Sequence, residues 1–199
     1  RLVVNSQSKV IYPRCFKGDI RKIYAQGEVF LEVAHDNKHP FIVESDDFKL
    51  QVLGTKFNIS NYKGGTTNIV LVEGAVEVTD KNEKKARLNP NDLLNIANGT
   101  IAYQKQVDVA EYISWVEGIM LLNGNDLSQI IQRLSIYYGI SIQCDPIIGK
   151  EKVYGKLDLK DDIDEVIECI QQTLPFTIEK SDTSIYLSLI HISEPTRPY

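Results

Sequence analysis

The first half of the chain is a succession of short β-type segments. Up to about residue 105, runs rich in valine, isoleucine, phenylalanine and tyrosine are separated by glycine, asparagine, aspartate and lysine. No window in this region shows the periodicity of an amphipathic helix. The pattern predicts a mainly β domain over residues 1–105, built either as a β-solenoid-like body or as an elongated stack of two sheets.

Gly54 marks a change of phase within the stretch VLGTKFNIS, residues 52–60. Apolar side chains fall on even positions before it and on odd positions after it, at Phe48, Leu50, Val52, Phe57 and Ile59. A strand has a period of two, so this shift turns the buried face to solvent unless the chain bends. A glycine inside a strand pattern indicates a bulge or a corner. We therefore expect Gly54 to be a structural residue at such a bend.

The second half alternates strands with helices. Residues 119–186 follow the order strand–helix–strand–strand–helix–strand–strand (βαββαββ), which predicts a small α+β domain with two helices on one sheet. The segment IMLLN, residues 119–123, is more uniformly apolar than the other strands of this half and is expected to be a central strand.

A linker helix is predicted between the domains, over residues 106–118, because apolar residues in DVAEYISWVEG follow helical spacing. The linker contains Trp115, the single tryptophan of the chain. We expect Trp115 either to pack between the two domains and fix their orientation or to belong to one core only.

The last residues are expected to have a different origin from the rest of the chain. The run LSLIHISEPTR matches the translation of a common transposase sequencing adapter. Residues 187–199 are therefore expected to be an adapter-derived artefact and carry no argument about the fold.

Composition limits the classes of partner. The chain has 199 residues, is 43% hydrophobic and carries a net charge of -5. This balance allows a real core, and the negative charge argues against nucleic acid or an anionic membrane surface as a partner. No apolar run is long enough to cross a bilayer, and the chain starts at Arg1 without a methionine, as a fragment does.

No constellation in the sequence predicts chemistry. The three cysteines are far apart without a CxxC, and His35 and His39 lie in the turn HDNKHP with no third ligand in sight. Four glutamates alternate with apolar residues as on the solvent face of a strand: Glu28, Glu32, Glu73 and Glu77. Catalytic triads and phosphate loops are absent. The sequence thus predicts no enzyme, no catalytic residue, no metal and no cofactor.

Three segments of the first half resemble the FecR family in order and spacing. They are QGEVFLEVAHDNKHPFIV, VLGTKFNISNY and VLVEGAVEV. LNPNDLLNI, residues 88–96, is similar to a later turn of that family, although Asn91 stands where glycine is usual. The segment that starts at WVEGIMLL resembles the C-terminal domain of many such proteins, which is similar to the secretin/TonB short N-terminal domain.

The resemblance implies a role in signalling. FecR-type anti-sigma regulators have a cytoplasmic segment, one membrane helix and a periplasmic region, and they couple an outer-membrane TonB-dependent transducer to an extracytoplasmic-function sigma factor. This chain then corresponds to the periplasmic, signal-receiving region of an inner-membrane protein in a Gram-negative bacterium. It would meet the sigma factor only through a missing cytoplasmic segment, and the membrane only through a missing upstream helix.

The implied partner is the signalling domain of the TonB-dependent receptor. An exposed strand edge is one way for two small α+β domains to join. The segment KVYGKLDL, residues 152–159, alternates apolar and polar residues and is the best candidate for this edge, although it is equally compatible with an internal strand. The expected partner-binding residues are Lys152, Val153, Tyr154, Lys156 and Asp158.

Two other functions remain open at this level. A β-rich carbohydrate-binding or enzymatic module would need a row of exposed aromatic side chains, whereas four tyrosines of the first half are scattered: Tyr12, Tyr24, Tyr62 and Tyr103. A scaffold subunit of a secretin-like assembly is favoured only by the C-terminal domain.

Overall fold

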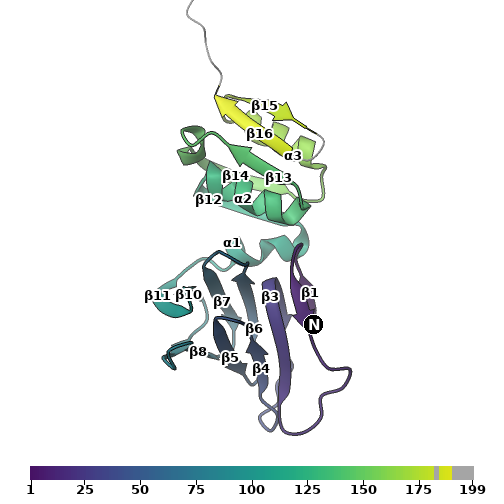
Figure 1. The fold of residues 1–199 in the computed structure, drawn as a ribbon, viewed down its shortest axis with the longest axis vertical. Coiled ribbons are helices and arrows are strands. Elements are labelled where there is room, and N and C mark those ends of the chain that lie inside the picture. The colour runs from purple at the N-terminus through teal and green to yellow at the C-terminus, as the bar shows by residue number, and fades with distance from the viewer. Residues whose placement is uncertain (182–183, 190–199) are drawn as a thin grey trace, which may run out of the picture. The chain divides into compact units, whose positions relative to one another are not determined.

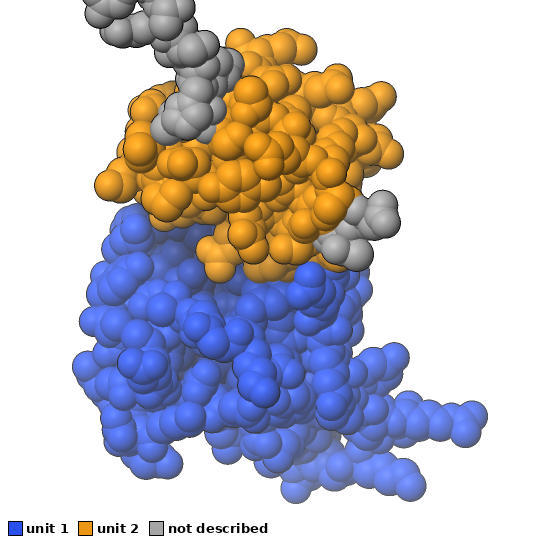
Figure 2. Space-filling view, turned by 45° about the horizontal axis from the view of Figure 1, so that its top comes forward, with its two compact units in different colours: residues 1–117 blue, residues 118–199 orange. Residues whose placement is uncertain are grey.

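The computed structural model describes residues 1–181 and 184–189. The chain divides after Glu117 into two compact units, coloured blue and orange in Figure 2. None of the helices in the described ranges is long and apolar enough to span a membrane.

The first unit is mainly β, as predicted (Figure 1). Its strands are β1 (Leu2–Val4), β2 (Lys9–Ile11), β3 (Arg21–Glu32), β4 (Phe41–Glu44), β5 (Phe48–Val52), β6 (Lys56–Asn61), β7 (Thr67–Glu73), β8 (Val76–Asp80), β9 (Lys85–Leu88), β10 (Asp92–Ala97) and β11 (Thr100–Gln106). The unit ends in helix α1 (Ala110–Ile113) and the 3-10 turn η1 (Ser114–Glu117), within the range expected for the linker helix.

The strands form one continuous path in the order β11-β10-β7-β6-β3-β4-β5-β8-β9, with β1 and β2 also paired to β3. Strand β3 joins the two halves of this path, because residues 27–32 pair with β6 and residues 21–24 pair with β4. Every neighbouring pair except β3–β4 is antiparallel. The first unit is therefore one long, mainly antiparallel sheet.

Strand β3 runs through Gly27 without a break. Gly27 has a φ of 91°, and a Cβ atom there would lie 2.4 Å from Ser8 Oγ. The same hydroxyl accepts the Glu28 N–H at 2.8 Å. The glycine therefore allows a close approach by the chain before β2 without ending the strand.

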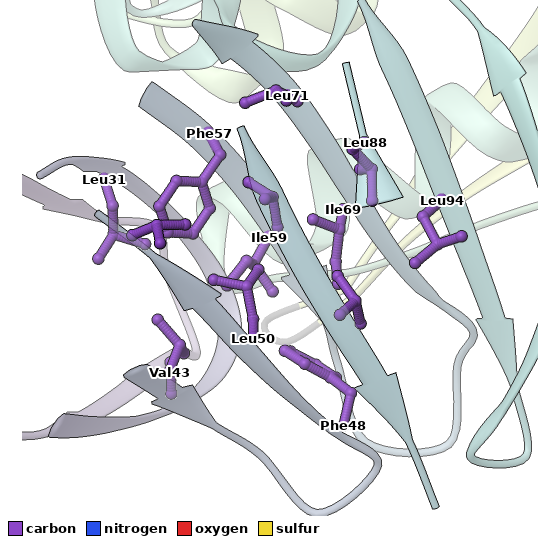
Figure 3. Close-up of a cluster of buried hydrophobic side chains, with 14 of the residues drawn as sticks. Leu31, Val43, Phe48, Leu50, Phe57, Ile59, Ile69, Leu71, Leu88 and Leu94 are labelled. Carbon is purple, nitrogen blue, oxygen red and sulfur yellow. The ribbon is translucent and has the colours of Figure 1, made fainter. Parts of the chain in front are cut away.

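The core of the first unit is formed by the apolar side chains on one face of almost every strand (Figure 3). Alternate residues of β5 are buried and exposed, as the period of a strand requires. Figure 3 shows the resulting cluster of aliphatic and aromatic side chains, among them Phe57, Ile59, Ile69 and Leu71, all fully buried.

Gly54 lies where the chain passes from one half of the sheet to the other. Strand β5 pairs with β4 and β8, whereas β6 pairs with β3 and β7. A Cβ atom on Gly54 would lie 2.5 Å from the Cα atom of His35. Gly54 does not have the positive φ that favours glycine. The space beside His35, not the backbone angle, requires a glycine at this corner.

The second unit has the predicted order of elements. These are β12 (Ile119–Asp126), α2 (Leu127–Tyr138), β13 (Ser141–Cys144), η2 (Ile148–Lys150), β14 (Lys152–Asp158), α3 (Ile163–Gln171), β15 (Phe176–Lys180) and β16 (Ser184–Leu189). Helix α2 buries Leu127, Ile130, Ile131 and Leu134 on one stripe and ends at Gly139, whose φ is 70°. Helix α3 starts at Asp162, whose carboxylate accepts the Asp164 N–H at 3.0 Å.

Two expectations about this unit are wrong. The strands form two small sheets, β12-β14 and β13-β16-β15, instead of one. Strand β12, expected to be central, pairs only with β14 among the described residues. Its uniform apolar character has another cause: Met120 and Leu122 are buried, and Ile119 and Leu121 on the opposite face are half-buried.

The segment interpreted as adapter-derived begins inside a strand. Residues Leu187–Leu189 continue β16, and Leu187 is buried and pairs with Cys144 and Ile178. Residues 190–199 lie outside the described part of the chain, so the artefact interpretation stays a prediction.

Candidate partner-binding edge

Strand β14 has one buried and one exposed face. Val153 and Leu157 are buried, whereas the side chain of Tyr154 is 70% exposed. Lys152, Lys156 and Asp158 are exposed as well. The structure thus brings the five predicted partner-binding residues onto one strand, although Val153 offers only its backbone because its side chain faces the core.

The outer edge of β14 carries backbone donors. The Leu159 N–H points toward β12, because it donates to the Gly118 carbonyl at 2.8 Å. In the same register, Leu121 lies opposite Lys156. In an antiparallel ladder the N–H groups of successive residues point alternately toward and away from the partner strand. The N–H of Lys156 therefore points away from β12, as do those of Tyr154 and Asp158. Within the described part of the chain, no strand pairs with this edge.

A bulge shapes the inner side of the same strand pair. The register between β12 and β14 shifts between Asn123 and Asn125. Gly124 at this point has a φ of 76°, and a Cβ atom on it would lie 2.9 Å from the Tyr154 hydroxyl. The glycine therefore gives the Tyr154 ring room beside the strand. Bulges increase the local twist of a strand pair and are common at sheet edges.

Charges on β14 limit how it can pair. Lys152 Nζ lies 2.9 Å from Asp126 Oδ1 on the neighbouring strand. Asp158 Oδ1 accepts the Lys160 N–H at 3.0 Å. Lysines on an edge strand discourage indiscriminate pairing with other chains, because a second edge must accommodate their charge. The edge suits a selected partner better than a random one.

Trp115 is anchored to the first unit. Its indole Nε1–H donates to Asn58 Oδ1 at 3.3 Å, and Asn58 lies in β6 with almost no exposed surface. The Asn58 amide donates in turn to Glu28 Oε1 at 3.1 Å, and Glu28 Oε2 accepts from the Asn5 amide at 2.7 Å. A role of Trp115 between the domains stays a prediction. The role of Asn58 was not predicted, because polar and apolar residues alternate in the first five positions of β6 and nothing distinguishes Asn58 from a solvent-facing residue.

The carboxylates with shifted pKa values serve turns and ion pairs. The Ile101 N–H, followed by the Lys84 and Asn82 N–H groups, lowers the pKa of the Asp80 carboxyl. Hydrogen bonds from Lys85 and Arg87 lower the pKa of Glu77. Each of these carboxylates has a structural partner.

The histidine turn has the same structural character. His39 Nδ1 lies 2.8 Å from Asp36 Oδ2, and this hydrogen bond lowers the pKa of the Asp36 carboxyl. Among the described residues, no group of three or more histidines, cysteines and carboxylates is placed to hold a metal ion.

Comparisons with known proteins agree with this architecture. The family model described as FecR protein matches residues 1–77, and the model described as FecR, C-terminal, matches residues 119–187. Two crystal structures of a proposed anti-sigma factor from Parabacteroides distasonis ATCC 8503, at 1.65 Å and 2.50 Å resolution, are similar to this chain, with TM-scores of 0.80 and 0.79. Each is 29% identical and covers 94% of this chain and 89% of its own. No match was found among curated protein sequences.

Proposed function

The chain belongs to the FecR family, and from this premise we propose that it is the periplasmic, signal-receiving region of a transmembrane anti-sigma factor. Family membership makes it a signalling regulator and points away from an enzyme. In the proposed relay, the chain senses the state of an outer-membrane TonB-dependent transducer. An upstream membrane helix and a cytoplasmic segment outside this sequence pass that state to an extracytoplasmic-function sigma factor.

The strongest support for the proposal is the order of the two family matches along the chain. Two models of the same family match the chain in order, one on each compact unit. The similarity to a proposed anti-sigma factor then extends over 94% of the chain, so it includes both units. A carbohydrate-binding or scaffolding protein that shared only one of the two units would not produce this combination.

The receptor contact is proposed at the outer edge of β14. An incoming strand from the receptor's signalling domain would accept hydrogen bonds from the outward N–H groups of Tyr154, Lys156 and Asp158. The exposed Tyr154 ring and the Lys156 ammonium would lie beside the incoming strand and contribute to its selection. The buried Val153 and Leu157 hold β14 on the core of the second unit.

Calorimetry with matched variants tests this contact. The whole chain is titrated with the signalling domain of the TonB-dependent receptor encoded beside its gene. Lys156→Pro removes one outward N–H and should weaken binding about tenfold or more, since a ladder hydrogen bond and its geometry are lost. Lys156→Ala is the control, because it removes the ammonium and keeps the N–H.

The outcomes separate the site from the function. Equal binding by wild type and a folded Lys156→Pro variant rules out this edge but leaves the relay standing. Absence of binding by the wild-type chain argues against the relay itself.

A further inference from the structure

A loop of the first unit exposes large apolar side chains. Residues 11–20, which are the last residue of β2 and the loop that follows it to β3, are all exposed and contain four such side chains: Ile11 at 53%, Tyr12 at 64%, Phe16 at 43% and Ile20 at 47%. In Figure 1 this loop belongs to the purple trace between β1 and β3. Scattered apolar residues on a surface are ordinary, but a gathered group of this kind marks an interaction site.

An apolar cavity lies directly beside the loop. Its volume is about 370 Å³, and its lining includes Val10, Ile23, Leu31 and Phe41 from the strands, with Tyr12 and Phe16 from the loop. The Phe16 ring meets the Phe41 ring edge-on, with 6.2 Å between their centres. The loop therefore borders a hollow that can receive apolar groups from outside.

Basic residues predominate in and beside the loop, although the hollow is also lined by Glu32, which pairs with Arg1 at 3.4 Å. Lys9, Arg14 and Lys17 have no carboxylate within ion-pair distance in the described ranges. Arg21 donates to the carbonyls of Ala34, His39 and Leu53, and its guanidinium lies 5.6 Å from the centre of the Phe41 ring, so no carboxylate neutralises it. Within the loop itself, Asp19 is the one acidic residue.

We infer that this surface, the loop 11–20 with its flanking Lys9 and Arg21, docks on an anionic lipid surface. Basic side chains next to such a surface gain about 1 kcal/mol each from its negative potential. Tyrosine and phenylalanine rings insert favourably at the boundary between headgroups and acyl chains. Unpaired cations interleaved with exposed apolar groups match both halves of that boundary.

The net charge of the whole chain, -5, averages over all faces, so it does not exclude an anionic membrane surface as the partner of one basic face. The acidic residues that produce this value lie mainly outside the loop, so one face can be basic while the protein is acidic. This inference does not depend on the receptor contact at β14.

Co-sedimentation of the whole chain with lipid vesicles tests the inference. One set of vesicles contains phosphatidylcholine alone, and the other also contains phosphatidylglycerol. We expect binding to the anionic vesicles that weakens with added salt, and much weaker binding to the neutral ones. Because two cations are removed, the variant Arg14→Gln with Lys17→Gln should bind the anionic vesicles about thirtyfold less tightly.

Matched controls separate the loop from general effects. Lys38→Gln with Lys63→Gln produces the same net charge and should bind as wild type does. Tyr12→Ser with Ile20→Ser should weaken binding about tenfold, since two inserted side chains are lost. Its control is Tyr103→Ser with Ile147→Ser, which changes the same two residue types at other exposed positions. Circular dichroism shows that each variant is folded.

Three results would overturn the inference. One is no binding to anionic vesicles, even if a protein ligand of the loop were found. Another is equal binding to both kinds of vesicle. The last is the same loss of binding in a loop variant and in its control.

Discussion

Strands in both units alternate apolar and polar residues, but the two units differ in how many neighbours these strands have. In the first unit, each inner strand of a long path has a neighbour on both sides, and the apolar faces meet in one core. In the second unit, β12 and β14 pair with each other and, among the described residues, with no further strand. Paired edges contribute stability, whereas an open edge keeps backbone donors available to a partner. The comparison indicates a stable β-body joined to a module suited to recognition.

The largest expected effect is on the core of the first unit. Phe57 is fully buried, so Phe57→Ala should lower the free energy of unfolding by about 3–5 kcal/mol. Urea unfolding followed by the fluorescence of Trp115, which is anchored in this unit, measures the change. Tyr103→Ala, at an exposed position, is the control. A loss no larger than that of the control would mean that this core does not stabilise the unit.

The next largest loss of stability is expected from a substitution at the corner formed by Gly54. Gly54→Val should cost about 1–3 kcal/mol, because the new side chain overlaps the backbone of His35. Gly65→Val is a matched control, since a Cβ atom there meets nothing closer than the Tyr62 carbonyl oxygen at 3.4 Å. Equal unfolding midpoints for the two variants would show that the corner tolerates a side chain.

The hydrogen bond between Trp115 and Asn58 should contribute less to the free energy of unfolding than the corner at Gly54 does. Trp115→Phe keeps an aromatic ring but removes the N–H that reaches Asn58, which leaves a buried oxygen without this donor. The expected cost is about 1–2 kcal/mol, measured by circular dichroism during urea unfolding. In an Asn58→Ala background the same substitution should cost clearly less, because the pair is already broken. An unchanged cost in that background contradicts the proposed anchor.

The smallest effect is a pH dependence at Asp80. Its folded-state pKa lies below the ordinary value of 3.8, because the N–H of Ile101 and two further N–H groups donate to the carboxylate. A lowered pKa stabilises the fold above pH 3.8, and this contribution is lost as the pH falls through the folded-state value. Wild type should therefore lose more stability than Asp80→Asn when acidified below about pH 4. Parallel acid unfolding curves for the two proteins would exclude this contribution.

Local patterns predicted much of the fold. The order of strands and helices predicted for 119–186 is present, and the apolar residues of 127–138, which recur at helical spacing, form the buried stripe of α2. Asn91, where the family usually has glycine, has a φ of 71°. Asparagine tolerates this angle better than most residues, so the turn survives the change.

Pairing over long distances was not predictable in the same way. The apolar sequence of β12 suggested a central strand, but the number of its neighbours depends on segments far along the chain. The alternation on β14 predicted its exposed face correctly, whereas the direction of the Lys156 N–H required the register with β12. The hydrogen bond between Trp115 and Asn58 joins residues 57 positions apart and left no local pattern.

Hydrogen exchange of the whole chain, with and without the receptor's signalling domain, tests the central claim most directly. The outward amides of Tyr154, Lys156 and Asp158 should exchange more slowly in the complex, because an added strand supplies their acceptors. Amides inside the paired strands β3 and β6 should be unchanged. Slower exchange confined to the first unit, or no change anywhere at saturating partner, would contradict the account of β14 as the receiving edge.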